Sequence, residues 1–273
     1  MKSYTEIIIE NISAEQSAVL IALLSEDGFE GFEEADNSLK AFINKENFDE
    51  AFLQELSKEY QFNYSTKNIE EQNWNALWES NFEPVVVDDF VTVRAHFHAS
   101  MQGTQHEILI TPKMSFGTGH HATTYMMMQQ MRALDFAGKS VFDFGTGTGV
   151  LAILAEKLGA QNIFAVDNDD WSVENAIENV NNNAGKNIVV EKAFDASAKN
   201  EQYDIVLANI NKNVILVNAQ TLNDVLSNNG YLLLSGLLKE DEMDIISIFS
   251  AFGLQHLNTQ QRAQWISLLW RKS

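Results

Sequence analysis

The residues in this sequence best suited to bind a cofactor lie in a glycine-rich turn. An apolar run that begins at Val141 leads into Asp143, and three glycines follow at alternate positions, Gly145, Gly147 and Gly149. A helical pattern begins directly after them. Because glycine has no Cβ, such a turn lets the backbone approach a nucleoside-like ligand closely. The pattern predicts a strand, a tight turn and a helix N-terminus that together bind a cofactor.

A second acidic residue supports this interpretation. The apolar stretch 162–166 predicts a strand that ends in Asp167, which lies 22 residues after Gly145. An acidic side chain at about this spacing binds ribose hydroxyls in nucleotide-binding folds. The two features together predict a Rossmann-like site for an adenosine-containing cofactor.

The spacing of the glycines favours one class of cofactor. In the dinucleotide fingerprint the third glycine would fall on Val150, one position after Gly149. No Gly-Lys-Ser/Thr sequence follows, so the P-loop pattern is absent. Asp143 would repel a pyrophosphate but suits the cationic sulfonium and amino groups of S-adenosylmethionine. We predict S-adenosylmethionine as the cofactor; the alternative is a tight strand–helix connection without a ligand.

Composition sets limits on the chemistry and the location of the protein. The chain has 273 residues, of which 45% are hydrophobic, enough for one large or two moderate domains. The absence of cysteine excludes disulfides, thiolate nucleophiles and cysteine-ligated metal sites. The N-terminal residues lack a signal-peptide core, and no apolar run approaches ~20 residues. We expect a soluble, cytoplasmic protein.

The chain is strongly acidic, with a formal net charge of −20. Residues 1–66 hold 14 acids and 4 bases, so half of the net charge lies in the first quarter of the chain. Phosphate binding needs clustered Lys and Arg, so direct nucleic-acid binding is not expected. An acidic surface would steer a basic protein partner, although it also serves solubility alone.

Residues 1–66 are predicted to form a small domain, followed by a linker helix over 67–82. A Ser13–Gln16 capping box starts a helix that runs to about Glu26. The β-α-β-β-α-β order is typical of a ferredoxin-like fold. Its other elements are expected as strands at 4–10, 29–35, 38–43 and 61–66 and a helix at 47–58. In the linker, Trp74, Leu77 and Trp78 share one helical face, suited to interdomain packing or to a ligand-facing wall.

Residues 83–273 are predicted to form a larger α/β domain. It starts with strands at 85–93 and 107–110. Helices and strands then alternate, which implies a doubly wound, mostly parallel sheet. Helices are expected at 123–134, 148–158, 171–183, 212–227 and 239–252, and strands at 140–144, 162–166, 187–191, 203–208, 230–236 and 264–271. Ligands bind at the carboxyl ends of such strands, where Asp143, Asp167 and Asn209 fall.

A polar loop, Ser-Phe-Gly-Thr-Gly-His-His-Ala-Thr-Thr, precedes the first of these helices. Thr123 and Thr124 can cap that helix or donate hydroxyl hydrogen bonds to a ligand. The adjacent His120 and His121 could bind a metal, but no second group of ligands stands at a suitable spacing, so no metal site is predicted. The three methionines that follow at 126–128 are expected to fill the core.

A third motif, Leu-Ala-Asn-Ile-Asn-Lys-Asn, ends an apolar strand at Asn209. The side-chain carbonyl of Asn209 and the next backbone carbonyl are two acceptors that could hold an amine with its lone pair toward the sulfonium methyl group. We therefore predict Asn209 as the catalytic residue, whereas Asn211 is expected to cap the following helix.

These motifs occur in one order that resembles the PrmA family, bacterial methyltransferases that modify ribosomal protein L11. The resemblance covers essentially the whole chain, and the Gly-Thr-Gly-His-His-Ala-Thr-Thr loop is its most specific part. Two mild departures are Thr148, where serine is common, and Ala122, where proline is common. The resemblance implies a class I methyltransferase domain over 83–273 and a substrate-recognition domain over 1–66.

The resemblance also implies site residues and an activity. Cofactor contacts would fall on Thr124, Gly145, Asp167 and Asn209, with Phe116, Thr118 and Gly147 lining the site. The activity implied is methyl transfer to lysine side chains and the N-terminal amine of L11, by a monomer whose linker lets the small domain move over the catalytic one.

The sequence is also compatible with other functions. Methyltransferases that act on adenine or on a glutamine amide usually carry Asn/Asp-Pro-Pro-aromatic, and Asn209 is followed by neither proline nor an aromatic residue. The further alternatives are a methyltransferase acting on another protein or a small-molecule amine, and a noncatalytic ribosome-assembly factor that keeps the cofactor fold as a scaffold.

Overall fold

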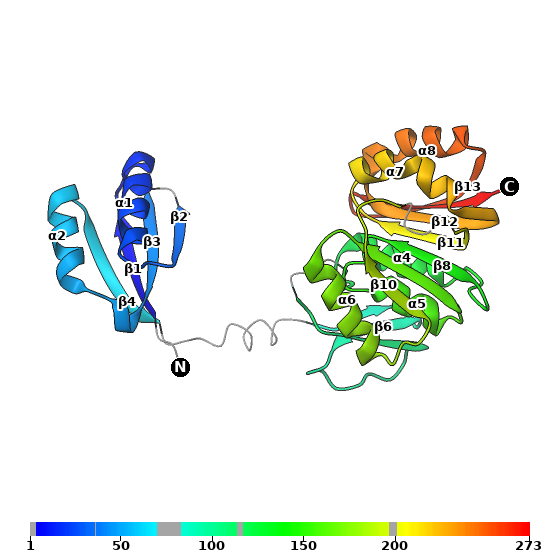
Figure 1. Cartoon of the computed structure of the whole chain (residues 1–273), viewed down its shortest axis with the longest axis horizontal. Helices are drawn as coiled ribbons and strands as arrows, with labels where there is room; N and C mark the ends of the chain where they lie inside the picture. The colour runs from blue at the N-terminus through cyan, green and yellow to red at the C-terminus, as the bar shows by residue number, and fades with distance from the viewer. Residues whose placement is uncertain (1–3, 36, 70–82, 114–116, 197–200) are drawn as a thin grey trace. The chain divides into compact units, whose positions relative to one another are not determined.

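The computed structural model describes residues 4–35, 37–69, 83–113, 117–196 and 201–273. It divides into two compact units, Met1–Asn81 and Phe82–Ser273, which are described separately (Figure 1). Residues 70–82 of the predicted linker helix, with Trp74, Leu77 and Trp78, lie outside the described residues and stay a prediction. Its predicted start at residue 67 was wrong, because residues 67–69 form the end of a strand. Among the described residues, none of the helices has the length and apolar character needed to cross a bilayer.

The N-terminal unit has the ferredoxin-like topology that its sequence pattern predicts. The sheet order is β2-β3-β1-β4, and all neighbouring strands are antiparallel. The elements are β1 (Tyr4–Glu10), α1 (Ala14–Glu26), β2 (Gly31–Ala35), β3 (Ser38–Asn44), η1 (Lys45–Asn47), α2 (Glu50–Tyr60) and β4 (Asn63–Ile69). The Ser13 hydroxyl accepts from Gln16 N at 3.2 Å and Gln16 Oε1 accepts from Ser13 N at 3.1 Å, so the predicted capping box is confirmed.

One face of this sheet carries the core of the unit. Alternate residues of β1 and β3, such as Ile7 and Leu39, are fully buried against leucines of α1 and α2. Figure 1 shows both helices over the same face. Burial of alternate strand residues is what a two-layer α/β sandwich requires.

The C-terminal unit contains a seven-stranded sheet in the order β10-β9-β8-β11-β12-β14-β13. Every neighbouring pair from β10 to β12 is parallel, and β14 is inserted antiparallel between β12 and β13. The strands are β8 (Ser140–Phe144), β9 (Asn162–Asp167), β10 (Ile188–Lys192), β11 (Tyr203–Asn209), β12 (Leu226–Leu238), β13 (Leu254–Arg262) and β14 (Trp265–Lys272). The predicted doubly wound, mostly parallel fold is confirmed.

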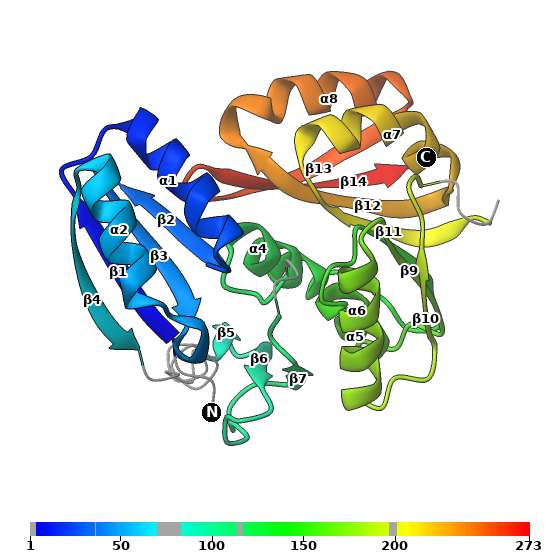
Figure 2. The same ribbon diagram turned by 60° about the vertical axis from the view of Figure 1, so that its left-hand side comes forward.

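Helices cover both faces of this sheet (Figures 1 and 2). The helices α4 (Ala122–Met131), α5 (Val150–Lys157) and α6 (Asp170–Asn182) lie on one face, and α7 (Lys212–Asp224), η2 (Lys239–Asp241) and α8 (Glu242–Ala251) follow on the other. Along β8, Val141 belongs to the first core and Phe142 to the second. Met126, Met127 and Met128 are buried, as predicted.

A small three-stranded sheet, β5 (Val85–Val87), β6 (Val91–Ala95) and β7 (His106–Ile110), precedes α4. The sequence pattern predicted one strand over 85–93, and this was wrong. Asp88 adopts φ +50° and Phe90 N donates to Val87 O at 3.0 Å, so the chain reverses into a β5–β6 hairpin.

The sequence pattern also missed β13. Its residues, Leu-Gln-His-Leu-Asn-Thr-Gln-Gln-Arg, are mostly polar, and only Leu254 among them is buried. This strand lies at the edge of the sheet, where pairing with β14 rather than apolar burial defines it. Hydrophobic alternation, the signal used for strands, is weak at such an edge.

Candidate active site

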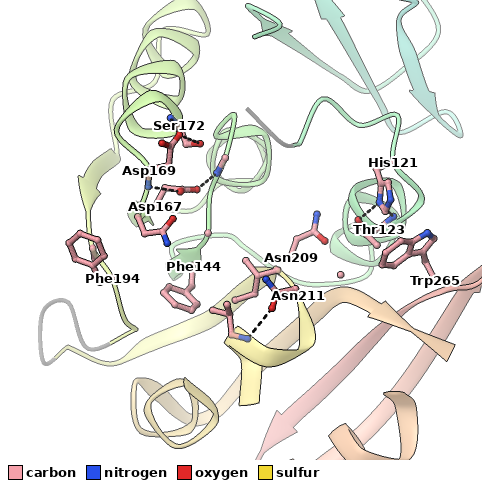
Figure 3. A pocket seen from close by; sticks show the side chains of 17 residues that line it. His121, Thr123, Phe144, Asp167, Asp169, Ser172, Phe194, Asn209, Asn211 and Trp265 are labelled. Atoms are coloured by element: carbon pink, nitrogen blue, oxygen red, sulfur yellow. Dashed lines mark hydrogen bonds between the residues drawn. The ribbon is translucent and has the colours of Figure 1, made fainter. Parts of the chain in front are cut away.

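A pocket of about 500 Å³ lies at the carboxyl ends of β8, β9 and β11. Figure 3 shows the side chains that line it, with Asn209 between an acidic group of residues and an aromatic one. The lining residues are His121, Thr123, Phe144, Gly145, Gly147, Asp167, Asn168, Asp169, Ser172, Ala193, Phe194, Asn209, Ile210, Asn211, Val214, Gly236 and Trp265. No lysine or arginine is present among these described lining residues.

The glycine-rich turn that follows β8 lines one end of the pocket. Gly145, Gly147 and Gly149 all have positive φ, at +78°, +56° and +80°. A Cβ on Gly145 would lie 2.3 Å from Ile210 Cγ2, so a larger residue would clash there as well as strain the backbone. The amides of Gly145 and Thr146 both donate to Val166 O at 2.9 Å, which fixes the turn against β9.

Asp167, at the end of β9, holds the turn from its other side. Its Oδ2 accepts from Gly147 N at 2.9 Å and its Oδ1 accepts from Asp169 N at 3.1 Å. Each carboxylate oxygen has more than one acceptor site, so the group can still receive two ribose hydroxyls. Asp169 then caps α6 by accepting from Ser172 N at 2.9 Å.

Asp143 lies beneath the turn rather than in the pocket. It is 1% exposed, its Oδ2 accepts from the Thr146 hydroxyl at 2.6 Å, and its Oδ1 has no partner among the described residues. Burial raises the pKa of Asp143 to about 7, and the Asp167 carboxylate also raises it. Its position in the sequence predicts a place beside the cofactor, but in the structure Asp143 is buried under the turn and is not among the described lining residues.

Asn209 stands at the end of β11, 8% exposed. Its Nδ2 donates to the Thr124 hydroxyl at 3.0 Å, which orients the amide. Its Oδ1 is buried and has no hydrogen-bond partner in the part of the chain that the structure describes. A buried polar atom without a partner costs stability, and it persists where function uses it. Asn211 accepts from Val214 N at 3.1 Å, which confirms that it caps α7.

The other end of the pocket is formed by His121, Thr123 and Trp265 (Figure 3). The rings of His121 and Trp265 meet edge to face, with centroids 4.6 Å apart. Burial lowers the pKa of His121. His121 Nδ1 accepts from Thr123 N at 3.4 Å and caps α4, so the expectation that a threonine caps this helix was wrong.

The structure brings together most of the residues predicted for the site. Gly145, Gly147, Asp167 and Asn209 line the pocket. Thr124 is fully buried and lies behind Asn209, whose amide it contacts. Thr118 is likewise absent from the described lining, and its hydroxyl bonds His120 Nδ1 at 3.1 Å. Phe116 lies outside the described residues.

Sequence reasoning missed several lining residues. Trp265 begins β14 and Phe194 follows β10, so neither belongs to a local motif. Gly236 interrupts β12, and a Cβ there would lie 2.2 Å from Ile210 O. A glycine inside an apolar strand was the one available signal, since it marks close backbone approach.

The lining suits a cationic, phosphate-free adenosine cofactor. Two aspartates and several uncharged acceptors face the pocket, and the described lining contains no cation to balance a pyrophosphate. Backbone glycines at the turn leave room for a nucleoside, and Asp167 stands where ribose hydroxyls bind. These residues fit S-adenosylmethionine.

Comparison with known proteins agrees with this chemistry. The family model "Ribosomal protein L11 methyltransferase (PrmA)" matches residues 5–273. A protein named ribosomal protein L11 methyltransferase from Chlorobaculum tepidum is 39% identical over 272 residues, covering 94% of this chain and 93% of the relative. Its namesake from Porphyromonas gingivalis is 38% identical over 258 residues, covering 92% and 89%.

A solved structure also matches this chain. The ribosomal protein L11 methylase from Lactobacillus delbrueckii subsp. bulgaricus has a TM-score of 0.65 and 26% sequence identity, and the match covers 70% of this chain and all of that one. The sequence matches span more than nine-tenths of this chain. The chain belongs to the PrmA family of S-adenosylmethionine-dependent methyltransferases.

Proposed function

We propose that this chain transfers methyl groups from S-adenosylmethionine to lysine side chains and to the N-terminal amine of ribosomal protein L11. The names of its relatives support L11 as the substrate. The observation that carries the choice of an amine is the buried Oδ1 of Asn209, a pocket-lining residue, which has no partner among the described residues. An amine N–H is a donor that this acceptor lacks.

Different residues of the chain bind the cofactor and position the substrate amine. When bound, the cofactor supplies a methyl group already activated on a sulfonium. Gly145, Gly147 and Asp167 hold its nucleoside part. Asn209 Oδ1, with the Ile210 carbonyl beside it, accepts from the substrate amine and aims its lone pair at the methyl carbon. Positioning of this kind supplies most of the rate acceleration in a displacement that needs no further activation.

The substrate amine must be neutral to attack. A lysine of pKa ~10.4 loses its proton at a cost of about 4 kcal/mol near pH 7.5, at 1.36 kcal/mol per unit. Burial next to a cationic sulfonium disfavours the ammonium form and supplies part of this cost. Burial lowers the pKa of His121, which favours the uncharged imidazole in the pocket. Water can carry the proton away.

The N-terminal unit is proposed as the part that recognises L11. Residues 1–66 carry 14 acids and 4 bases, and this charge favours encounter with a basic ribosomal protein. The division into a recognition domain over 1–66, a linker over 67–82 and a catalytic domain over 83–273 belongs to the same proposal. We further propose a monomeric, cytoplasmic enzyme that does not bind nucleic acid directly.

The test is to locate the transferred methyl group. The purified chain is incubated with radiolabelled S-adenosylmethionine and, separately, free L11, ribosomes and tRNA, and mass spectrometry then places the label. Label on lysine Nζ atoms or the N-terminal nitrogen of L11 is the expected result. Label on tRNA or on another protein would discard the proposed substrate, and S-adenosylmethionine binding without any transfer would favour the assembly-factor alternative.

A further inference from the structure

Helix α6 presents three asparagines to the free edge of β7. Asn183, just after the helix, pairs with both peptide groups of Leu109: Oδ1 accepts from Leu109 N at 3.0 Å and Nδ2 donates to Leu109 O at 2.6 Å. Asn179 Oδ1 accepts from Thr111 N at 2.7 Å, and Asn175 Nδ2 donates to Thr111 O at 3.0 Å. Side-chain amides take the place of a neighbouring strand along this edge.

The match has a simple geometric basis. Asn175, Asn179 and Asn183 are four residues apart, a rise of about 6 Å along a helix. The peptide groups at Leu109 and Thr111 are two residues apart, about 6.6 Å along a strand. The two repeats agree closely enough for successive amides to meet successive peptide groups, which satisfies backbone groups that would otherwise be buried without partners.

Asn179 differs from the other two because it also reaches the glycine-rich turn. Its Nδ2 donates to Thr148 O at 2.9 Å. The Thr148 hydroxyl in turn donates to Gly117 O at 2.7 Å. Asn179 and Thr148 are both fully buried, so no solvent competes for these bonds. A continuous hydrogen-bonded path therefore runs from Thr111 through Asn179 and Thr148 to Gly117.

This path connects the two segments that frame the pocket. Thr148 belongs to the turn, while Thr111 and Gly117 are on the chain that leads into α4, where the Thr124 hydroxyl meets Asn209. The contact at Gly117 is tight: φ is +105° and a Cβ would lie 2.9 Å from Thr148 Oγ1. We propose that Asn179 is a positioning residue for cofactor binding, which sets the turn and the approach to α4 in register.

The inference goes beyond the identity of the methyl acceptor, because it concerns the cofactor alone. Its test measures the affinity of the full chain for S-adenosylhomocysteine by calorimetry, with a melting temperature for every variant. Asn179→Leu removes the link to the turn, whereas Asn183→Leu removes two hydrogen bonds to the same strand but none to the turn.

We expect Asn179→Leu to weaken binding about tenfold, as the loss of one or two buried hydrogen bonds implies. Asn183→Leu should lower the melting temperature and leave the affinity within about twofold of the parent. Equal losses of affinity in the two variants would overturn the proposal, since both would then act through general destabilisation.

The Thr148 variants test the same path independently and decide the question if Asn179→Leu does not fold. Thr148→Val, which lacks the hydroxyl, should weaken binding about fivefold, and Thr148→Ser should restore it. Adding Thr148→Val to Asn179→Leu should weaken binding by less than the product of the single effects, because the two act in one network. Equal affinities for Thr148→Val and Thr148→Ser, or fully multiplicative losses, would contradict the path.

Discussion

The two ends of the pocket are built by different means. The turn end contains Gly145, Gly147 and Asp167. There, backbone amides donate to both carboxylate oxygens of Asp167, and the Gly145 amide donates to Val166 O in β9. At the acceptor end, formed by Asn209, His121 and Trp265, side chains from distant elements meet, and Oδ1 of Asn209 has no partner among the described residues. The hydrogen bonds of the turn end form within the protein itself. The acceptor end contains a buried acceptor atom that has no donor among the described residues.

From this contrast we propose that each end of the pocket has a separate task. Preorganised backbone groups bind a ligand without rearrangement, which suits the part that holds the cofactor. A buried acceptor without a partner costs on the order of 1–3 kcal/mol of stability, and a substrate N–H recovers that cost on binding. Changes at the turn end should therefore act on cofactor affinity, and changes at Asn209 should act on the rate of transfer.

The largest expected effect is at Asn209. Asn209→Ala should lower the rate of methyl transfer at saturating cofactor by about 10²–10³, comparable to removal of one preorganised polar group in other enzymes. Its effect on cofactor affinity should stay below about tenfold. The control is Asn218→Ala, since Asn218 is similarly buried and hydrogen-bonded but does not line the pocket. Full turnover in Asn209→Ala would rule out its role.

Asp167→Ala tests the other end. It removes an acceptor of two backbone hydrogen bonds and of the ribose hydroxyls, so the dissociation constant for S-adenosylhomocysteine should rise about 100-fold. Asp167→Asn should give a smaller loss, because an amide keeps one acceptor oxygen but lacks the charge. Calorimetry measures both. A variant with normal affinity and a reduced rate would break the proposed division.

Trp265→Leu tests whether Trp265 contacts the substrate rather than the cofactor. Loss of the indole that packs edge to face on His121 should raise KM for L11 about fivefold, through lost contact with the substrate. Trp265→Phe should recover part of this, and cofactor affinity should be unchanged in both. A rise in the cofactor dissociation constant instead would place Trp265 at the cofactor.

The smallest effect is a pH dependence at Asp143. In the folded chain burial raises its pKa from 3.8 to about 7. Because the folded pKa lies above the unfolded one, the group lowers folding stability as pH rises from about 4 to about 7, and the full penalty remains above that. Asp143→Asn should thus gain about 5–10 °C more in melting temperature at pH 8 than at pH 5. Equal gains at both pH values would show that Asp143 does not titrate in this range.

Local chemistry made the turn end predictable from sequence. The positive φ of Gly145 needs glycine, and an acid at the end of the next strand can bind ribose wherever the fold is doubly wound. The role of Asn211 followed equally from its position before a helix. In these cases the signal lies in a few consecutive residues at the end of a strand or at the start of a helix.

The acceptor end was only half predictable, because its walls depend on tertiary closure. His121 and Trp265 come from opposite ends of the catalytic unit and meet because β14 inserts antiparallel beside β12. No local pattern announces that insertion, and the polar edge strand β13 that accompanies it was missed. The Asn175–Asn179 pair escaped notice for the same reason: asparagines inside a helix are informative only once β7 is known to lie against them.

The most direct test of the division of labour is the double variant of Asp167→Ala and Asn209→Ala. Single-turnover transfer to L11 and affinity for S-adenosylhomocysteine are measured for each single variant and for the pair. If the two ends act separately, the affinity of the double variant stays within about tenfold of that of Asp167→Ala, because Asn209→Ala alone changes the affinity by less than about tenfold. Its saturated transfer rate stays within about twofold of that of Asn209→Ala. A double variant whose saturated rate falls well below that of Asn209→Ala, or in which Asn209→Ala alone already accounts for the whole loss of affinity, would contradict the account.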